Sequence, residues 1–279
     1  MPPATLSMVI SWTAFVNLAL LNRQERQHIA SLRAHHLLAN VGTLTWDDLL
    51  ALLLQRRLLS LTIVNVYECV IDALESDAIK ATVRLILHEE YSRNTRGMPL
   101  ASHRELLFRD LLHLGASREC ILTTSEAAAT QEVRLASLQA LQRCLGQPHS
   151  DLALIAFLRF WAEVLVSVEY ECLWPRLSER LAHGAAAEGV RSEFFYYHMI
   201  HDRRQSDIGA EQLLGGLTHS QELARHMAEL IDSESALQIA IGQVERAWEL
   251  KDRFYRQFVA MPAISPPPDQ AASPRPATP

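Results

Sequence analysis

Glycine is scarce in this sequence, and the residue pattern of a β-strand is missing. Only ten glycines occur among 279 residues, and no segment alternates apolar and polar residues convincingly over the length of a strand. Apolar stripes at helical spacing run through most of the chain instead. These features exclude sheet architectures and predict an all-α protein that is long enough to bury an extended core.

Cysteine is also rare, and basic residues are not concentrated anywhere. The four cysteines, Cys69, Cys120, Cys144 and Cys172, form no C-x-x-C pair. This spacing favours reduced core thiols in a cytoplasmic protein over a disulfide framework or a zinc site. The net charge is −6 and the pI is about 6.1, so no basic surface indicates binding to nucleic acid.

The first residues lack the features of a targeting or membrane segment. The stretches 8–10 and 15–21 are apolar, but Trp12, Thr13 and Asn17 interrupt them. No basic region precedes them and no small-residue cleavage site follows. We therefore expect a packed amphipathic segment and no membrane partner.

Helix start and stop signals divide the chain into one helical domain and a tail. The tail, residues 262–279, is rich in proline and is predicted to be disordered, whereas residues 1–261 form the domain. Capping residues are expected at Ser76, Ser102, Ser117 and Ser233. The expected helices cover about 22–39, 45–74, 76–91, a segment from 102, a short one after 117, 129–145, 150–181, 190–204, 207–230 and 233–258.

Acids and histidines stand where the helical pattern calls for apolar residues. Glu90 closes an apolar stripe, Glu169 follows the apolar run 164–168, and His198 and Asp202 are spaced one helical turn apart. Buried charges are rare unless they are paired or bind a metal. Three helices with one inward acid each therefore suggest a carboxylate and histidine metal site in a bundle. A solvated helix end for Glu90 and an ordinary helix-face pair for His198 and Asp202 stay open as alternatives.

The order of these residues resembles a known family. A glutamate ends one helix and a histidine follows after a loop, at Glu90 and His103; a second glutamate lies in mid-helix with a proline soon after, at Glu169; and aromatic residues precede a His-x-x-x-Asp motif within 194–202. Over about residues 30–258, the chain resembles the haem-oxygenase-like diiron oxidases and oxygenases. These are relatives of thiaminase II and pyrroloquinoline-quinone synthase.

The resemblance implies a haem-oxygenase-like single-domain helical bundle. Its iron ligands would be Glu90, His103, Glu169, His198 and Asp202, with Glu169 bridging two irons. An unpaired acid buried at position 169 should destabilise the metal-free protein. Glu169→Leu is therefore expected to raise the melting temperature.

One position departs from the family pattern. The third member of the family's His-x-x-x-Asp-x-x-His motif is Gln205 in this sequence, and glutamine is a poor iron ligand. His201 lies on the same helical face, about 40° from Gln205, and is the candidate substitute. Three versions stay open: two irons with one atypical ligand, one iron, or two irons when the substrate supplies a ligand.

The resemblance also implies a reaction. Iron, cycling between Fe(II) and Fe(III) and present as two ions, would activate dioxygen as cosubstrate. The substrate would be a small amino-acid-derived molecule in specialised metabolism, oxygenated at nitrogen or cleaved at a carbon–carbon bond. An external electron donor and a homodimer are further expectations.

Two alternatives come from other classes. A metal-free enzyme of the thiaminase II or quinone-synthase type would need a nucleophile, for which Cys144 and Cys172 are the candidates near apolar faces. A non-catalytic helical interaction protein would carry a decayed metal site, with Gln205 as the first sign.

Overall fold

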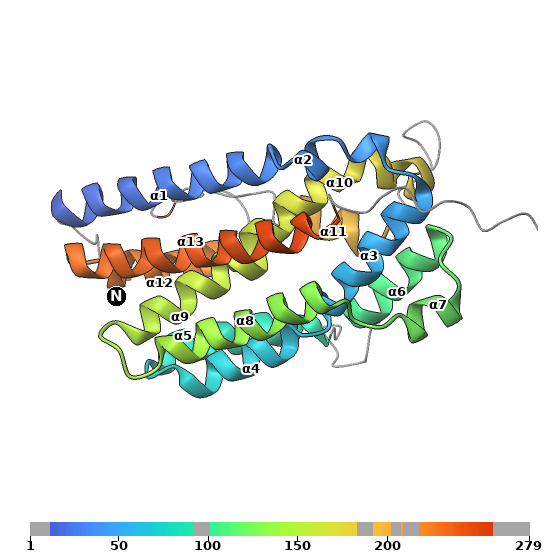
Figure 1. The fold of residues 1–279 in the computed structure, drawn as a ribbon. Helices are drawn as coiled ribbons and strands as arrows, with labels where there is room; N and C mark the ends of the chain where they lie inside the picture. Colours follow the sequence, from blue (N-terminus) through green and yellow to red (C-terminus); the bar gives the residue numbers. More distant parts are fainter. Residues whose placement is uncertain (1–11, 92–100, 183–191, 202–207, 209–217, 259–279) are drawn as a thin grey trace, which may run out of the picture.

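The computed structural model describes residues 12–91, 101–182, 192–201, 208 and 218–258. The predicted tail, 262–279, lies outside this part of the chain. Every regular element in the described ranges is a helix, which confirms the predicted fold class (Figure 1). The elements are α1 (Trp12–Arg33), α2 (His36–Ala39), η1 (Val41–Thr43), α3 (Trp46–Ser60), α4 (Ile63–Ala73), α5 (Asp77–Glu90), α6 (His103–His113), α7 (Arg118–Thr123), α8 (Ala128–Cys144), α9 (Ser150–Leu158), η2 (Arg159–Val164), α10 (Leu165–Leu181), α11 (Phe195–His201), α12 (His219–Leu230) and α13 (Glu234–Arg256).

The centre of the fold is one continuous helical path formed by α9, η2 and α10. Residues 152–158 of α9 are all buried, as expected of a helix that is apolar on every side. Helix α13 packs along α1 and α9, and Figure 1 shows α1 and α13 side by side. Helix α12 packs on α9 and η2, and α11 packs on α10.

Side-chain caps begin several helices where the sequence predicts them. The hydroxyls of Ser102, Ser117 and Ser233 accept hydrogen bonds from the backbone three residues later. Ser102 also forms a reciprocal capping box with Glu105, which satisfies two backbone donors at the start of α6. These contacts confirm the predicted starts near 102, 117 and 233.

The predicted helices 22–39 and 45–74 each differ from the structure. The first begins earlier, at Trp12, and is interrupted after Arg33. The second is divided at Leu61–Thr62, where the hydroxyl of Thr62 donates a hydrogen bond to the carbonyl of Leu59. This contact takes a carbonyl that a continuous helix would use for its own ladder.

The stretch Trp46–Ala73 is long and apolar enough to cross a membrane, judged by length and composition. In the fold it supplies core leucines, including Leu49, Leu52 and Leu53. It also carries the buried cation Arg56. A helix of the core passes the same test of length and composition, so the stretch carries little weight as a membrane segment.

Candidate functional site

A cavity of about 350 Å³ opens among α3, α4, α6, η2, α10 and α11. Apolar side chains such as Leu59, Leu107 and Val166 form much of its wall. Acids, imidazoles and cations are set into this wall, which is the composition of a small-molecule site. The charged and imidazole residues are Arg56, Glu90, His103, Arg104, Glu163, His198, His219 and Lys251.

Two predicted ligands, Glu90 and His103, are brought together by the structure. Glu90 is the last residue of α5, and His103 is the first residue of α6. Nδ1 of His103 lies 3.2 Å from Oε1 of Glu90. Burial lowers the pKa of His103, but the contact with Glu90 outweighs it, so the net pKa is raised. The charges of His219 and Glu163 also act on His103, which connects it to a second pair.

The predicted ligand His198 stands next to His103. The two rings are 4.8 Å apart between centroids, in an edge-to-face arrangement. Nδ1 of His198 lies 2.7 Å from the backbone carbonyl of Phe194. Because a carbonyl only accepts, Nδ1 carries the proton and Nε2 keeps its lone pair. A backbone carbonyl on one ring nitrogen is the usual way in which a metal-binding histidine is oriented.

A buried carboxylate, Asp110 of α6, holds the start of the helix that carries His198. Its oxygens accept hydrogen bonds from the hydroxyl of Ser192 at 2.6 Å, from the N–H of Glu193 at 3.1 Å, and from the N–H groups of Phe194 and Phe195 at 3.1 Å each. The N–H groups of Phe194 and Phe195 stand at the start of α11, where backbone donors have no helical partners. Asp110 thereby fixes α11 against α6, the helix of His103.

A second carboxylate and imidazole pair joins Glu163 of η2 to His219 of α12. Nδ1 of His219 lies 3.5 Å from Oε2 of Glu163, and the hydroxyl of Tyr67 donates a hydrogen bond to Oε1. Burial raises the pKa of Glu163, but His219, Tyr67 and the charge of His198 lower it, and the net pKa lies below its ordinary value. Glu163 is therefore a buried carboxylate held in its ionised form.

Sequence reasoning missed Glu163, and its setting explains why. On an ideal helix Glu163 and Glu169 lie about 120° apart, and the apolar stripe favours Glu169. The actual path passes through a π-helical segment at Arg159–Val164, which changes the angle between residues. Such segments occur often at functional sites. Every residue from 152 to 170 is buried. The apolar pattern therefore could not show which side of this helical path faces the cavity.

His219 was also missed, although a signal for it exists. Both histidines of the two pairs occupy the first position of a helix that opens with a capping box. Ser102 and Glu105 enclose His103, and Thr218 and Gln221 enclose His219. The pattern [ST]-His-x-[EQ] thus marks both positions in the sequence.

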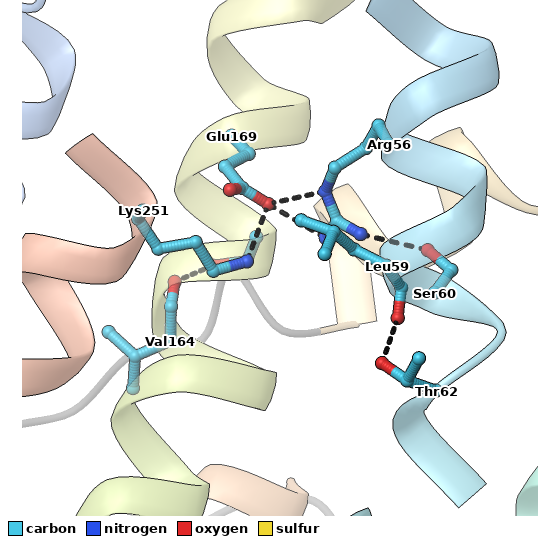
Figure 2. Close-up of polar contacts among 8 residues, drawn as sticks. Arg56, Leu59, Ser60, Thr62, Val164, Glu169 and Lys251 are labelled. Atoms are coloured by element: carbon cyan, nitrogen blue, oxygen red, sulfur yellow. Dashed lines mark hydrogen bonds and ion pairs between the residues drawn. The ribbon is translucent and has the colours of Figure 1, made fainter. Parts of the chain in front are cut away.

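The structure gives Glu169 different partners from the predicted ones. Its Oε2 accepts from Nε and Nη2 of Arg56 at 3.0 and 2.8 Å and from Nζ of Lys251 at 3.0 Å. Figure 2 shows Arg56 of α3 and Lys251 of α13 both reaching this oxygen of Glu169, which belongs to α10. Glu169 is not among the residues that line the cavity with Glu90 and His103. An acid in an apolar run is compensated here by two cations, one of which comes from 113 positions away in sequence.

This buried ion cluster of Arg56, Glu169 and Lys251 shifts the ionisation of its cations. Burial, together with the charge of Arg56, lowers the pKa of Lys251 to about 7, although Glu169 opposes the shift. For Arg56, burial lowers the pKa, but Glu169 outweighs it and the net pKa is raised. Arg56 is therefore the permanent cation of the cluster, and Lys251 is the one that titrates near neutral pH.

The remaining predicted ligands lie at or beyond the end of α11. His201 ends α11, while its side chain, together with Asp202 and Gln205, lies outside the described residues. Their roles as ligands stay predictions. Among the side chains that the structure describes, no three acids, histidines or cysteines converge closely enough to hold one metal ion.

Two solved structures share this fold at low sequence identity. One is a TenA family transcription regulator from Silicibacter sp. TM1040, with 13% identity, a TM-score of 0.56, and coverage of 88% of this chain and 97% of that one. The other is a CADD-like protein of unknown function from Nostoc punctiforme, with 14% identity, a TM-score of 0.61, and coverage of 87% and 97%. The chain shares the helical fold of these TenA-family and CADD-like proteins, which confirms the predicted all-α architecture and carries no activity with it. No protein-family model and no curated protein matches the sequence.

Proposed function

We propose that this protein binds non-haem iron and uses dioxygen to oxidise a small amino-acid-derived substrate. The observation that carries the proposal is the pair of carboxylate and imidazole contacts, Glu90 with His103 and Glu163 with His219, on the wall of one cavity. His198 adjoins the first pair. Glu163 takes the role that the sequence suggested for Glu169.

The donor chemistry of this cluster fits iron. Carboxylate and imidazole are the ligands of oxygen-activating non-haem iron sites, whereas thiolates favour Cu(I), zinc and iron–sulfur clusters. Both cysteines in or near the core, Cys144 and Cys172, are absent from the cavity wall. The described donors do not converge on a single metal position, so we expect carboxylates such as Glu90 to reorient when iron binds. Asp202, four residues after His198, remains a proposed further ligand.

Iron held there would supply the one-electron chemistry that reduces dioxygen, which side chains alone lack. The chain itself would bind, orient and exclude water. Tyr67 fixes one oxygen of Glu163, and Asp110 fixes the helix of His198. The apolar part of the wall keeps water away from the reacting atoms. An external donor would return the electrons.

The alternative of a metal-free enzyme is weakened because burial disfavours the thiolate form of its two candidate nucleophiles. Burial raises the pKa of both Cys144 and Cys172 to about 11. Both thiols are therefore protonated at neutral pH, and a thiol is a far weaker nucleophile than a thiolate. The non-catalytic alternative differs from our proposal in one measurable property, the binding of iron.

Iron retention by the full chain tests the proposal. The protein is loaded anaerobically with Fe(II), desalted and measured by elemental analysis. We expect wild type to retain iron, and Glu163→Gln and His103→Ala to lose at least about 10-fold in affinity. Each variant has a matched control that should retain iron as wild type does. Glu171→Gln lies on the same helical path as Glu163, and His113→Ala lies on the same helix as His103. No retained iron in wild type, or equal retention by Glu163→Gln and Glu171→Gln, would overturn the proposal.

A further inference from the structure

Two buried cations lie on the wall of the same cavity as the proposed metal ligands. Lys251 is 1% exposed and Arg56 is 4% exposed. The chain contains only two lysines, Lys80 and Lys251, and one of them is enclosed in the core. Isolated buried ammonium groups are costly, so a cation here needs a reason beyond solubility.

The cations, and not their carboxylate, face the cavity. Arg56 and Lys251 both line it, whereas Glu169 does not. All three of the contacts with Glu169 end on Oε2. A molecule in the cavity therefore meets the positive side of the ion cluster.

The cluster also has more positive charge than the one carboxylate of Glu169 neutralises, and more donors than contact its Oε2. One carboxylate faces two cations, which leaves a surplus of one positive charge when Lys251 is protonated. Arg56 has five N–H donors; two point to Glu169 and one, through Nη1, to Ser60. Two N–H donors of Arg56 remain beyond these three contacts. An anion in the cavity could take both the surplus charge and these donors.

We infer that Arg56 and Lys251 form a subsite for the carboxylate of a small, largely apolar carboxylic acid. The inference deepens the proposed function, because the acid would be the substrate or a close analogue of it. In the metal-free protein, Glu90 and Glu163 repel an anion from their part of the wall, so the carboxylate belongs at the cations. The apolar body of the acid then contacts residues such as Leu59 and Trp161.

Charge count favours a carboxylate over a phosphate. A carboxylate carries one negative charge and matches the surplus of one. A phosphate group carries closer to two and would leave the ion cluster itself with a net negative charge. Burial is the main cause of the lowered pKa of Lys251 and the charge of Arg56 is the second, so an anion placed beside the two cations would raise this pKa.

Lysine NMR on the metal-free full chain tests this subsite directly. Labelling lysine with ¹³C at Cε gives two lysine signals, of which Lys80 is the internal control. The probe is 4-phenylbutyrate, and 4-phenylbutyramide is its neutral match. We expect the acid to shift the Lys251 signal in a saturable way and to leave Lys80 unchanged. The amide should bind at least 10-fold more weakly.

Two variants complete the test by calorimetry. Lys251→Met should weaken binding of the acid at least 10-fold and change binding of the amide little, whereas Lys80→Met should change neither. Equal binding of acid and amide, an unmoved Lys251 signal at saturation, or a response to inorganic phosphate equal to that of the acid would overturn the inference. Because no iron is present, this result is independent of iron retention, and failure of one does not imply failure of the other.

Discussion

The buried ion cluster reverses the sign of one expectation drawn from the sequence. An unpaired acid at position 169 would make Glu169→Leu stabilising, but the structure pairs Glu169 with Arg56 and Lys251. Removing one member of a buried ion pair costs about 3–5 kcal/mol, because the remaining charge is left uncompensated. Lys251 can release its proton and Arg56 cannot, so the cost comes from Arg56. We expect Glu169→Leu to lower the free energy of unfolding by about 3 kcal/mol or more and Tm by about 6–12 °C.

Urea unfolding and calorimetry of the metal-free protein measure this effect. Glu171→Leu is the matched control on the same helix, because its ion pair with Arg33 is partly exposed and worth at most about 1 kcal/mol. Adding Arg56→Met and Lys251→Met to Glu169→Leu should restore most of the lost stability, since the triple change leaves no charge in this cluster. A Tm for Glu169→Leu at or above that of wild type would refute this reading of the cluster.

Three further predictions follow from the described contacts and the implied assembly. Lys251 has a pKa of about 7 in the folded protein and an ordinary pKa of 10.5 in the unfolded chain. Between pH 7 and 10.5 the unfolded chain therefore binds more protons than the folded protein. The stability contributed by this group rises with pH across that window. Lys251→Met should therefore stabilise the protein more at pH 6 than at pH 9.5, by on the order of 3 kcal/mol, and a difference that does not change with pH would contradict the shift. Asp110→Asn keeps the shape of the side chain but cannot accept as strongly from the start of α11; hydrogen exchange should quicken in α11 and iron affinity should fall at least about 10-fold, whereas unchanged exchange would remove Asp110 as the anchor. The implied homodimer predicts a mass by light scattering of about twice the 31.4 kDa of one chain, and a monomer mass at micromolar protein would contradict it.

Local signals were enough to predict the helical architecture. Capping serines begin helices within a residue of where the structure has them, because a cap acts through atoms three residues apart. The pairing of Glu90 with His103 was also within reach, since the family pattern includes both and each stands at a helix end. These features depend on neighbours in sequence or on one family pattern.

Long-range and irregular features were out of reach. The partner of Glu169 is Arg56, which sits in a leucine-rich helix with nothing local to mark it as buried. Glu163 depends on a π-helical segment, and no residue type specifies such a segment. An ideal helical wheel assumes 100° per residue and one buried face, and both assumptions fail between α9 and α10.

Dioxygen uptake by the iron-loaded protein tests the central claim most directly. An oxygen electrode follows anaerobically loaded wild type and Glu163→Gln after mixing with buffer that contains dioxygen, with free Fe(II) at the same concentration as the reference. We expect rapid uptake in proportion to protein-bound iron, and a rate for Glu163→Gln that falls to that of free Fe(II). Uptake by the loaded wild type at the rate of free Fe(II), or full uptake by Glu163→Gln, would contradict the claim.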